Sequence, residues 1–308
     1  YADMERWFYE NGMTRFIPPG ESREGLVFTN LTPGTKGFNL DIFAGTDSHN
    51  FTFFVPIPGF TADYTDINFA QLYQPDEIRD MSIDELRTFL AEEFNCCATD
   101  PTGQLDAAPL NVVLVGSARM VRQALMRGYW QETEAGWREV ETLRPQYFMQ
   151  RKADSVFYQS RADGDESIEL RLWRAPWTVD AQPVWIGQAI YAIRNDSFWS
   201  DLADAELLKD SEFAKTFVHE STSADLDSAQ NFVLQNFWYS QSLAKMGMVG
   251  GIQQTTIAEP GQSYTGWDYF TKGYRLVMFL SAQPLALDEV DLIYDSKRQI
   301  EPIGADDV

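Results

Sequence analysis

The sequence predicts an α+β protein, in which a small N-terminal antiparallel β-sheet region is followed by a larger mixed-sheet α+β domain. Short β-branched and aromatic runs fill the first sixty residues and return later, between segments with helical periodicity. Strands and helices do not alternate regularly enough for a doubly wound fold. Because 44% of the 308 residues are hydrophobic, the chain can bury a sizeable core.

The N-terminal β structure is predicted from three runs that are interrupted by turn residues. The runs are Gly25–Asn30, Gly37–Phe43 and Asn50–Val55, and the turns contain Pro33-Gly34 and Gly45–Asp47. A small antiparallel sheet is the simplest arrangement for such runs.

A helix is then predicted to begin after Ser82, which is a typical N-cap and precedes leucines and phenylalanines at helical spacing. The almost wholly apolar run Leu110–Val115 predicts a central strand covered on both faces. Ser117 is predicted as the N-cap of a helix over residues 118–126.

The rest of the chain continues this mixture of strands and helices. We expect strands over Phe148–Tyr158, Ser167–Trp173 and Pro183–Ile193, a helix over Ala224–Met246, and a closing strand pair over Met248–Ile257 and Tyr274–Leu280.

Four regions follow from these elements. We expect an N-terminal β-rich region over residues 1–60, a helical connector over 61–108, an α+β domain over 109–290 and an acidic tail over 291–308.

The charge of the chain excludes some classes of partner. The 46 acidic and 24 basic residues give a formal net charge of -22. Nucleic acid is not an expected partner, because binding it requires a basic face. Anionic lipid headgroups would be repelled for the same reason. No apolar stretch is long enough to span a membrane, and the start at Tyr1 fits either a removed signal or anchor segment or a trimmed chain.

Adjacent cysteines at Cys96 and Cys97 allow two interpretations. They can close an eight-membered disulfide ring that acts as a conformational clip or redox sensor, or they can remain as two buried thiols. The ring is plausible outside the cytoplasm, where disulfides persist. A CxxC pattern is absent, so we expect no structural zinc.

One cluster of residues could support metal-dependent chemistry. His219 precedes Asp225 and Asp227, and these residues with Glu169 form the candidate catalytic set. The same stretch also fits a helix N-cap with favourable acid–dipole interactions, and this is the preferred interpretation. We therefore expect no metal or other cofactor.

A second cluster is rich in tryptophan and arginine. The candidate interface residues are Arg171, Trp173, Arg174, Trp177 and Trp185. Indoles beside guanidinium groups can form a stacking platform or an interface hot spot. Packing in the core is the other interpretation and the preferred one for the tryptophans, because Trp173 and Trp185 fall inside expected strands.

Gly116-Ser117 does not complete either of two known motifs. A nucleophile elbow requires a second glycine where Arg119 stands, and a phosphate loop requires a following Gly-Lys-Ser/Thr. Ser117 is therefore expected only to cap its helix.

An ordered series of segments resembles the LssY C-terminal domain family of bacterial envelope proteins. The segments that carry the resemblance are Cys96–Gly103, Pro109–Gly116, Arg171–Trp177 and Pro183–Gln188, preceded by Pro58–Tyr64 and Leu72-Tyr73. The resemblance covers about Pro58 to Ser281 and implies an envelope location. It implies no reaction.

The chain departs from this family at two polar positions. Glu169 stands where members often have His, and Gln230 stands where they often have Arg, whereas His219 matches the first histidine of the family. These departures favour a binding or structural role over catalysis.

The leading hypothesis is a non-enzymatic, membrane-associated envelope protein. We expect it to be an accessory or structural subunit, periplasmic or on the extracytoplasmic face of the membrane, that binds a protein partner in a membrane-protein complex. The alternative is a metal-dependent hydrolase acting on a lipid or phosphate substrate at the His219 cluster, and a third hypothesis is a carbohydrate-binding module on the N-terminal sheet.

Overall fold

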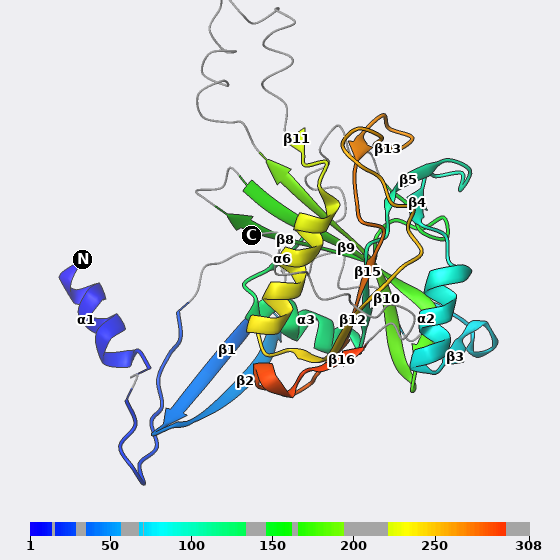
Figure 1. Ribbon diagram of the computed structural model, residues 1–308. Coiled ribbons are helices and arrows are strands. Elements are labelled where there is room, and N and C mark those ends of the chain that lie inside the picture. The colour runs from blue at the N-terminus through cyan, green and yellow to red at the C-terminus, as the bar shows by residue number, and fades with distance from the viewer. Residues whose placement is uncertain are drawn as a thin grey trace, which may run out of the picture.

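The computed structural model describes residues 1–13, 16–28, 35–56, 68–69, 71–133, 146–161, 166–193 and 221–293. The fold is α+β, as predicted, with one large mixed sheet, small two-stranded antiparallel sheets and α-helices. Figure 1 shows the large sheet with its helices, the β1–β2 hairpin that extends away from them, and helix α1 standing apart.

The large sheet forms the centre of the molecule. Its strand order is β16 (Asp291–Ile293), β12 (Leu243–Val249), β15 (Arg275–Leu280), β6 (Val112–Val115), β10 (Gln182–Ile193), β9 (Glu166–Val179), β8 (Ser155–Arg161) and β7 (Gln131–Thr133). In addition, β11 (Ser221–Thr222) pairs with β10, and β3 (Arg79–Met81) pairs with β9. The pairs β6–β15, β12–β16 and β3–β9 are parallel, and the other pairs are antiparallel.

Helices cover both faces of this sheet. On one face, α3 (Ala118–Arg127) and α6 (Leu226–Tyr239) pack against apolar side chains of the central strands. On the other face, α2 (Ile83–Glu92) and the segment that follows it form a second core with alternate residues of the same strands. All four residues of β6 are buried, which confirms the prediction of a central strand covered on both sides.

Short elements complete the large domain. The strands β4 (Cys97–Thr99) and β5 (Asp106–Pro109) pair with each other, as do β13 (Gly261–Gln262) and β14 (Asp268–Tyr269). Two 3₁₀ helices, η2 (Pro75–Glu77) and η4 (Leu287–Glu289), lie among the described residues. Ser82 caps α2 with a reciprocal capping box to Glu85, as its sequence position predicted.

The N-terminal region contains a hairpin and one helix. Strands β1 (Thr35–Ala44) and β2 (Asp47–Pro56) pair antiparallel over ten residue pairs. Helix α1 (Ala2–Asn11) was not predicted, because its apolar residues were taken for part of a β-rich region. Leu26 forms only an isolated bridge to Gly12, so Gly25–Phe28 is not the expected strand.

Two later boundaries also differ from the prediction. The strand expected from Phe148 begins only at Ser155, because positive φ angles at Met149 and Gln150 turn the chain first. The helix expected to continue to Met246 ends at Tyr239, and β12 replaces its end. In this second case, pairing with β15 outweighs the helical spacing of the apolar residues.

The expected connector is joined to the large domain. Strand β3 pairs with β9, and Leu86 and Leu90 of α2 lie in the second core. The expected tail contributes β16 to the edge of the sheet, and residues 294–308 lie outside the described part of the chain.

Candidate functional site

The carboxylates of the candidate catalytic set have structural roles. Asp225 is the N-cap of α6 and accepts hydrogen bonds from the backbone of Asp227 and Ser228, at 3.1 and 3.2 Å. Asp227 accepts hydrogen bonds from the Thr271 hydroxyl and the Lys272 backbone, at 2.8 and 3.0 Å. The prediction of a helix cap is therefore confirmed for Asp225.

Only one of the two remaining members lies in the described part of the chain. Glu169 lies on β9 and forms an ion pair with Arg171, two residues along the same strand. His219 lies outside the described residues. Within the part of the chain that the structure describes, no three His, Cys, Asp or Glu side chains come together to hold a metal ion. Gln230 is buried and donates hydrogen bonds to the carbonyls of Asn111 and Tyr274, which anchors α6 to the sheet.

The tryptophan and arginine cluster lies largely in the core. Trp173 and Trp185 are buried, as are Arg171 and Arg174, whereas Trp177 is half-buried. The preferred interpretation of core packing is thus confirmed for Trp173 and Trp185, because alternating residues of β9 and β10 point into the two helix-covered layers. The candidate interface is corrected for the four buried residues, which form no exposed platform.

Arg174 belongs to a buried charge network. Its backbone N–H donates to Asp154 at 2.7 Å, and its guanidinium donates to backbone carbonyls that include that of Trp177. Arg151 donates to Asp154 at 2.7 Å and to the Tyr73 hydroxyl at 2.8 Å. Burial raises the pKa of Asp154 and that of Tyr73, and Arg151 opposes both shifts. The network joins three separate segments and is consistent with a structural role.

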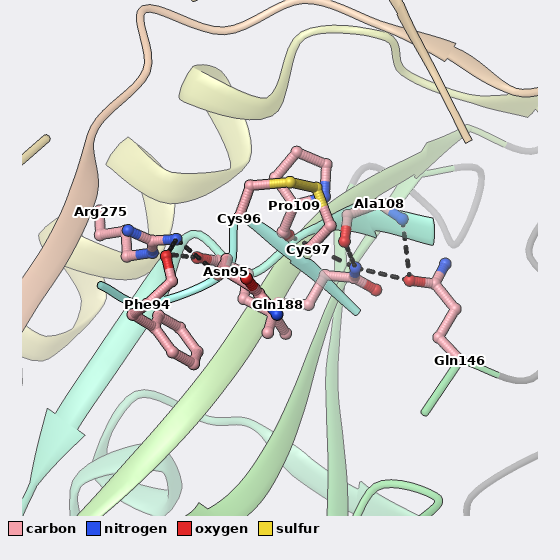
Figure 2. Close-up of a disulfide and its surroundings, with 10 residues drawn as sticks. Phe94, Asn95, Cys96, Cys97, Ala108, Pro109, Gln146, Gln188 and Arg275 are labelled. Atoms are coloured by element: carbon pink, nitrogen blue, oxygen red, sulfur yellow. Dashed lines mark hydrogen bonds between the residues drawn. A yellow bond between two sulfur atoms is a disulfide. The ribbon is translucent and has the colours of Figure 1, made fainter. Parts of the chain in front are cut away.

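Cys96 and Cys97 form a disulfide, which decides between the two interpretations left open by the sequence. The ring follows α2 along the chain and includes Cys97, the first residue of β4, and Figure 2 shows it beside Pro109. Chain-entropy arguments give about 3 kcal/mol for a disulfide that closes a 15-residue loop and less for shorter loops. A ring between neighbouring residues is therefore poorly suited to stabilise the fold.

A buried arginine anchors the chain just before this disulfide. Arg275 on β15 is fully buried, and its guanidinium donates to the carbonyls of Leu90, Asn95 and Leu110, at 2.6, 2.8 and 3.2 Å. It also lies 4.8 Å from the ring centre of Phe94. Burial lowers its pKa to about 10, so it remains charged at neutral pH. Sequence reasoning missed Arg275, whose only signal is a cation at the start of an apolar strand.

A pair of carboxamides holds the other side of the disulfide segment. Gln188 donates to Gln146 at 2.7 Å and to the carbonyl of Ala108 at 3.0 Å, as Figure 2 shows. Gln146 accepts from the backbone N–H of Ala108 at 3.3 Å. The disulfide is thus flanked by Arg275 on one side and by this amide pair on the other.

The β1–β2 hairpin turns its polar face towards the domain. Thr52 is only 9% exposed, and its hydroxyl donates to Asn39 at 2.8 Å and accepts from Arg127 of α3 at 3.2 Å. Gln123 of α3 donates to the Thr52 carbonyl at 3.4 Å. Burial lowers the pKa of Arg127, and Asp41 on the same hairpin face opposes this shift. Polar contacts therefore hold the hairpin on α3.

The opposite face of the hairpin is apolar and points away from α3. Because side chains alternate along each strand, one face carries Phe38, Leu40, Ile42, Phe51, Phe53 and Val55, which we call the outer face. Leu40, Ile42, Phe51, Phe53 and Val55 are 39–52% exposed. The rings of Phe38 and Phe53 stack across the two strands with centroids 5.5 Å apart. The hairpin thus has the reverse of the usual arrangement, in which the apolar face is turned inward.

Helix α1 adds further exposed aromatic surface. Trp7 and Phe8 contact Phe28 with ring centroids 6.0 and 4.5 Å apart, yet the three residues remain 40–50% exposed. Seventeen of the 25 large exposed apolar residues in the described part of the chain precede residue 56, whereas its buried apolar residues all lie between Met81 and Leu280. The N-terminal region is therefore the candidate functional surface.

Comparison with known protein families, characterised proteins and solved structures finds no match for this chain. In the described ranges, no helix is both long and apolar enough to cross a membrane.

Proposed function

We propose that this chain is a non-enzymatic docking protein whose β1–β2 hairpin binds a protein partner through its outer face. The observation that carries the proposal is the orientation of the hairpin. Its polar face is attached to α3 by Arg127 and Gln123, whereas its aromatic and aliphatic face is exposed. A contiguous apolar surface rimmed by polar groups is typical of an interaction site.

The same orientation supports a stable interaction platform. A two-stranded hairpin alone is marginal in water, so it gains from its attachment to the domain. The contacts of Thr52 with α3 provide that attachment without covering the outer face. Binding therefore does not require the hairpin to detach from α3.

The charge of the chain indicates the chemistry of the partner. The net charge is -22, and the acidic residues of the hairpin, Asp41 and Asp47, lie on its polar face and at its tip. A complementary partner has an apolar surface bordered by Lys and Arg, because opposite potentials steer association and suppress wrong partners. Anionic lipid is disfavoured by the same charge.

We place this partner in a membrane-associated complex on the extracytoplasmic side, with the chain as an accessory subunit of the cell envelope. The Cys96–Cys97 disulfide supports an oxidising compartment, where such bonds persist. The resemblance to the LssY C-terminal domain family supports the same location.

The proposal is tested by photo-crosslinking in the native cells. A photoreactive phenylalanine analogue replaces Phe51 on the outer face or, as the matched control, Tyr239 at the end of α6, which is 75% exposed. We expect a crosslink from position 51 to one protein, which mass spectrometry then identifies, and no such crosslink from position 239. The crosslinked peptide of the partner should combine apolar residues with Lys or Arg.

Three outcomes would contradict the proposal. They are crosslinking of position 51 to lipid alone, crosslinking to a second copy of this chain alone, and equal crosslinking from positions 51 and 239. Binding to a glycan array through the outer face would instead favour a carbohydrate-binding module.

A further inference from the structure

We propose that Cys96–Cys97 is a redox-active site that accepts electrons from a dithiol. The proposal concerns a part of the large domain that the docking function does not use. Figure 2 shows the disulfide with Arg275 on one side and Gln146 and Gln188 on the other.

The bond is poorly explained as a stabilising crosslink. It joins neighbouring residues, so it closes the shortest possible loop and constrains the unfolded chain least. Residues 94–110 are already held by other groups, chiefly Arg275 and the Gln146–Gln188 pair. Since the chain contains two cysteines in all, this pair is its whole capacity for reversible thiol chemistry.

The two cysteines differ in their exposure to solvent. Cys96 is half-buried, whereas Cys97 is only 5% exposed. A thiolate attacks one sulfur of a disulfide and expels the other, so access decides which sulfur is attacked. Cys96 is the more exposed residue of the pair, so we expect the attack at its sulfur.

The reaction balances as a thiol–disulfide exchange. One thiolate of the dithiol forms a bond to Cys96 Sγ, the Cys96–Cys97 bond breaks, and Cys97 leaves as a thiolate that takes up a proton. The second thiolate of the dithiol then attacks the dithiol sulfur that is bonded to Cys96 in the mixed disulfide. This releases Cys96 as a thiolate, which is also protonated. In total the protein gains two electrons and two protons, and the dithiol becomes a disulfide.

Hydrogen bonds connect the backbone around the disulfide ring to neighbouring elements. The Asn95 carbonyl accepts from Arg275 at 2.8 Å, and the Cys96 carbonyl accepts from the Leu110 backbone at 2.9 Å. Phe94 contacts the half-buried ring of Trp177 with centroids 5.3 Å apart. Opening the ring frees the backbone around Cys96, so reduction changes the end of α2 and the surroundings of Trp177.

The test uses the full chain under native conditions. Oxidised protein is treated with dithiothreitol in one arm and with thioredoxin, as a protein dithiol, in the other. We expect a mass gain of two hydrogen atoms, faster hydrogen exchange over residues 94–110 and retained far-UV circular dichroism. The melting temperature should fall by only a few degrees, because a disulfide between neighbouring residues constrains the unfolded chain least.

A trapping experiment identifies the attacked sulfur. A thioredoxin variant in which the second active-site cysteine is replaced by serine forms a mixed disulfide that does not resolve. We expect this adduct on Cys96. The double variant Cys96→Ser/Cys97→Ser is the control, and its hydrogen exchange should not respond to reductant.

The outcomes separate the possibilities. Reduction in both arms supports a protein dithiol as the natural reductant, and reduction by dithiothreitol alone supports a small dithiol. Resistance to both until the protein unfolds, an adduct on Cys97, or unchanged exchange over residues 94–110 after reduction would overturn the proposal. If the double variant does not fold, hydrogen exchange of the reduced wild-type protein still shows whether reduction loosens residues 94–110. Failure here leaves the crosslinking test of the hairpin unaffected.

Discussion

Trp173 and Trp185 of the large domain are buried between layers of helix and sheet, whereas Phe51 and Phe53 of the hairpin are about half exposed. Both regions are rich in aromatic residues and both are β structure. They differ in what covers the sheet. The large sheet has helices on both faces, but the hairpin meets α3 only through its polar side.

This difference shows that aromatic content alone does not locate a binding surface. A tryptophan cluster in sequence marks a core when its strands are covered on both faces. A strand with alternating polar and apolar residues marks a docking surface when its polar face packs against the rest of the protein and its apolar face stays exposed. Substitutions in the two regions test the contrast between covered and exposed aromatic residues, beginning with the largest expected effect on stability.

Replacing Trp173 by Ala should destabilise the domain most. The side chain is fully buried, and its indole donates to the Arg151 carbonyl at 3.0 Å. We expect the free energy of unfolding to fall by about 3–5 kcal/mol, as for other large-to-small core changes. Urea denaturation measures this, with the exposed Tyr239→Ala as control. A loss for Trp173→Ala no larger than that of the control would contradict the assignment of this residue to the core.

Replacing Arg275 by Met should have the next largest effect. The change keeps apolar volume but leaves the carbonyls of Leu90 and Leu110 buried without their donor. Unsatisfied buried groups cost about 1–3 kcal/mol. Hydrogen exchange should show the loss first at the end of α2, and uniform loosening of the whole domain would argue against a local anchor.

Replacing Asp100 by Asn should remove a dependence of stability on pH. Hydrogen bonds from Thr102 and the Leu105 backbone lower the pKa of Asp100 from its ordinary 3.8 to about 2. A lowered pKa means that the ionised form stabilises the fold above the ordinary pKa, and that this stability is lost as the pH falls through the folded value. Melting temperatures between these two pH values should fall less steeply for Asp100→Asn than for wild type. Parallel curves would show that Asp100 does not contribute.

Replacing Phe51 and Phe53 together by Ser should change stability least. Both side chains are already about half exposed, and surface changes usually remain within about 0.5 kcal/mol. Partner binding should instead fall by at least about tenfold, as for aromatic hot spots. Binding is measured by isothermal titration with the partner that crosslinking identifies. The matched control is Phe43→Ser, because Phe43 is exposed on the other face of the hairpin. Equal effects of the two variants would refute the assignment of binding to the outer face.

Local signals in the sequence predicted much of the fold. The Ser82 capping box, the Ser117 cap and the apolar strand β6 were read correctly because each depends on neighbouring residues. Residues 240–246 were misread as helix because the competing interaction, pairing with β15, lies far away in the chain. Helix α1 was missed although Met4, Trp7 and Phe8 have helical spacing and its first turn is acidic.

The candidate site was less predictable than the fold. The alternation of apolar residues along β1 and β2 was visible, but the sequence does not state which face meets the domain. Contacts of Thr52 with Arg127 and Gln123, more than seventy residues away, decide that orientation. The cysteine pair was visible, whereas its anchor Arg275 became apparent only when the strand and α2 were brought together.

The most direct test of the central claim is side-chain footprinting of the protein in its native complex. Hydroxyl-radical labelling compares Phe51, Phe53 and Tyr239 in the isolated chain and in the complex. The docking account predicts that the labelling of Phe51 and Phe53 falls towards that of the buried Phe157, while Tyr239 is unchanged. Unchanged labelling of both phenylalanines in the complex would contradict it.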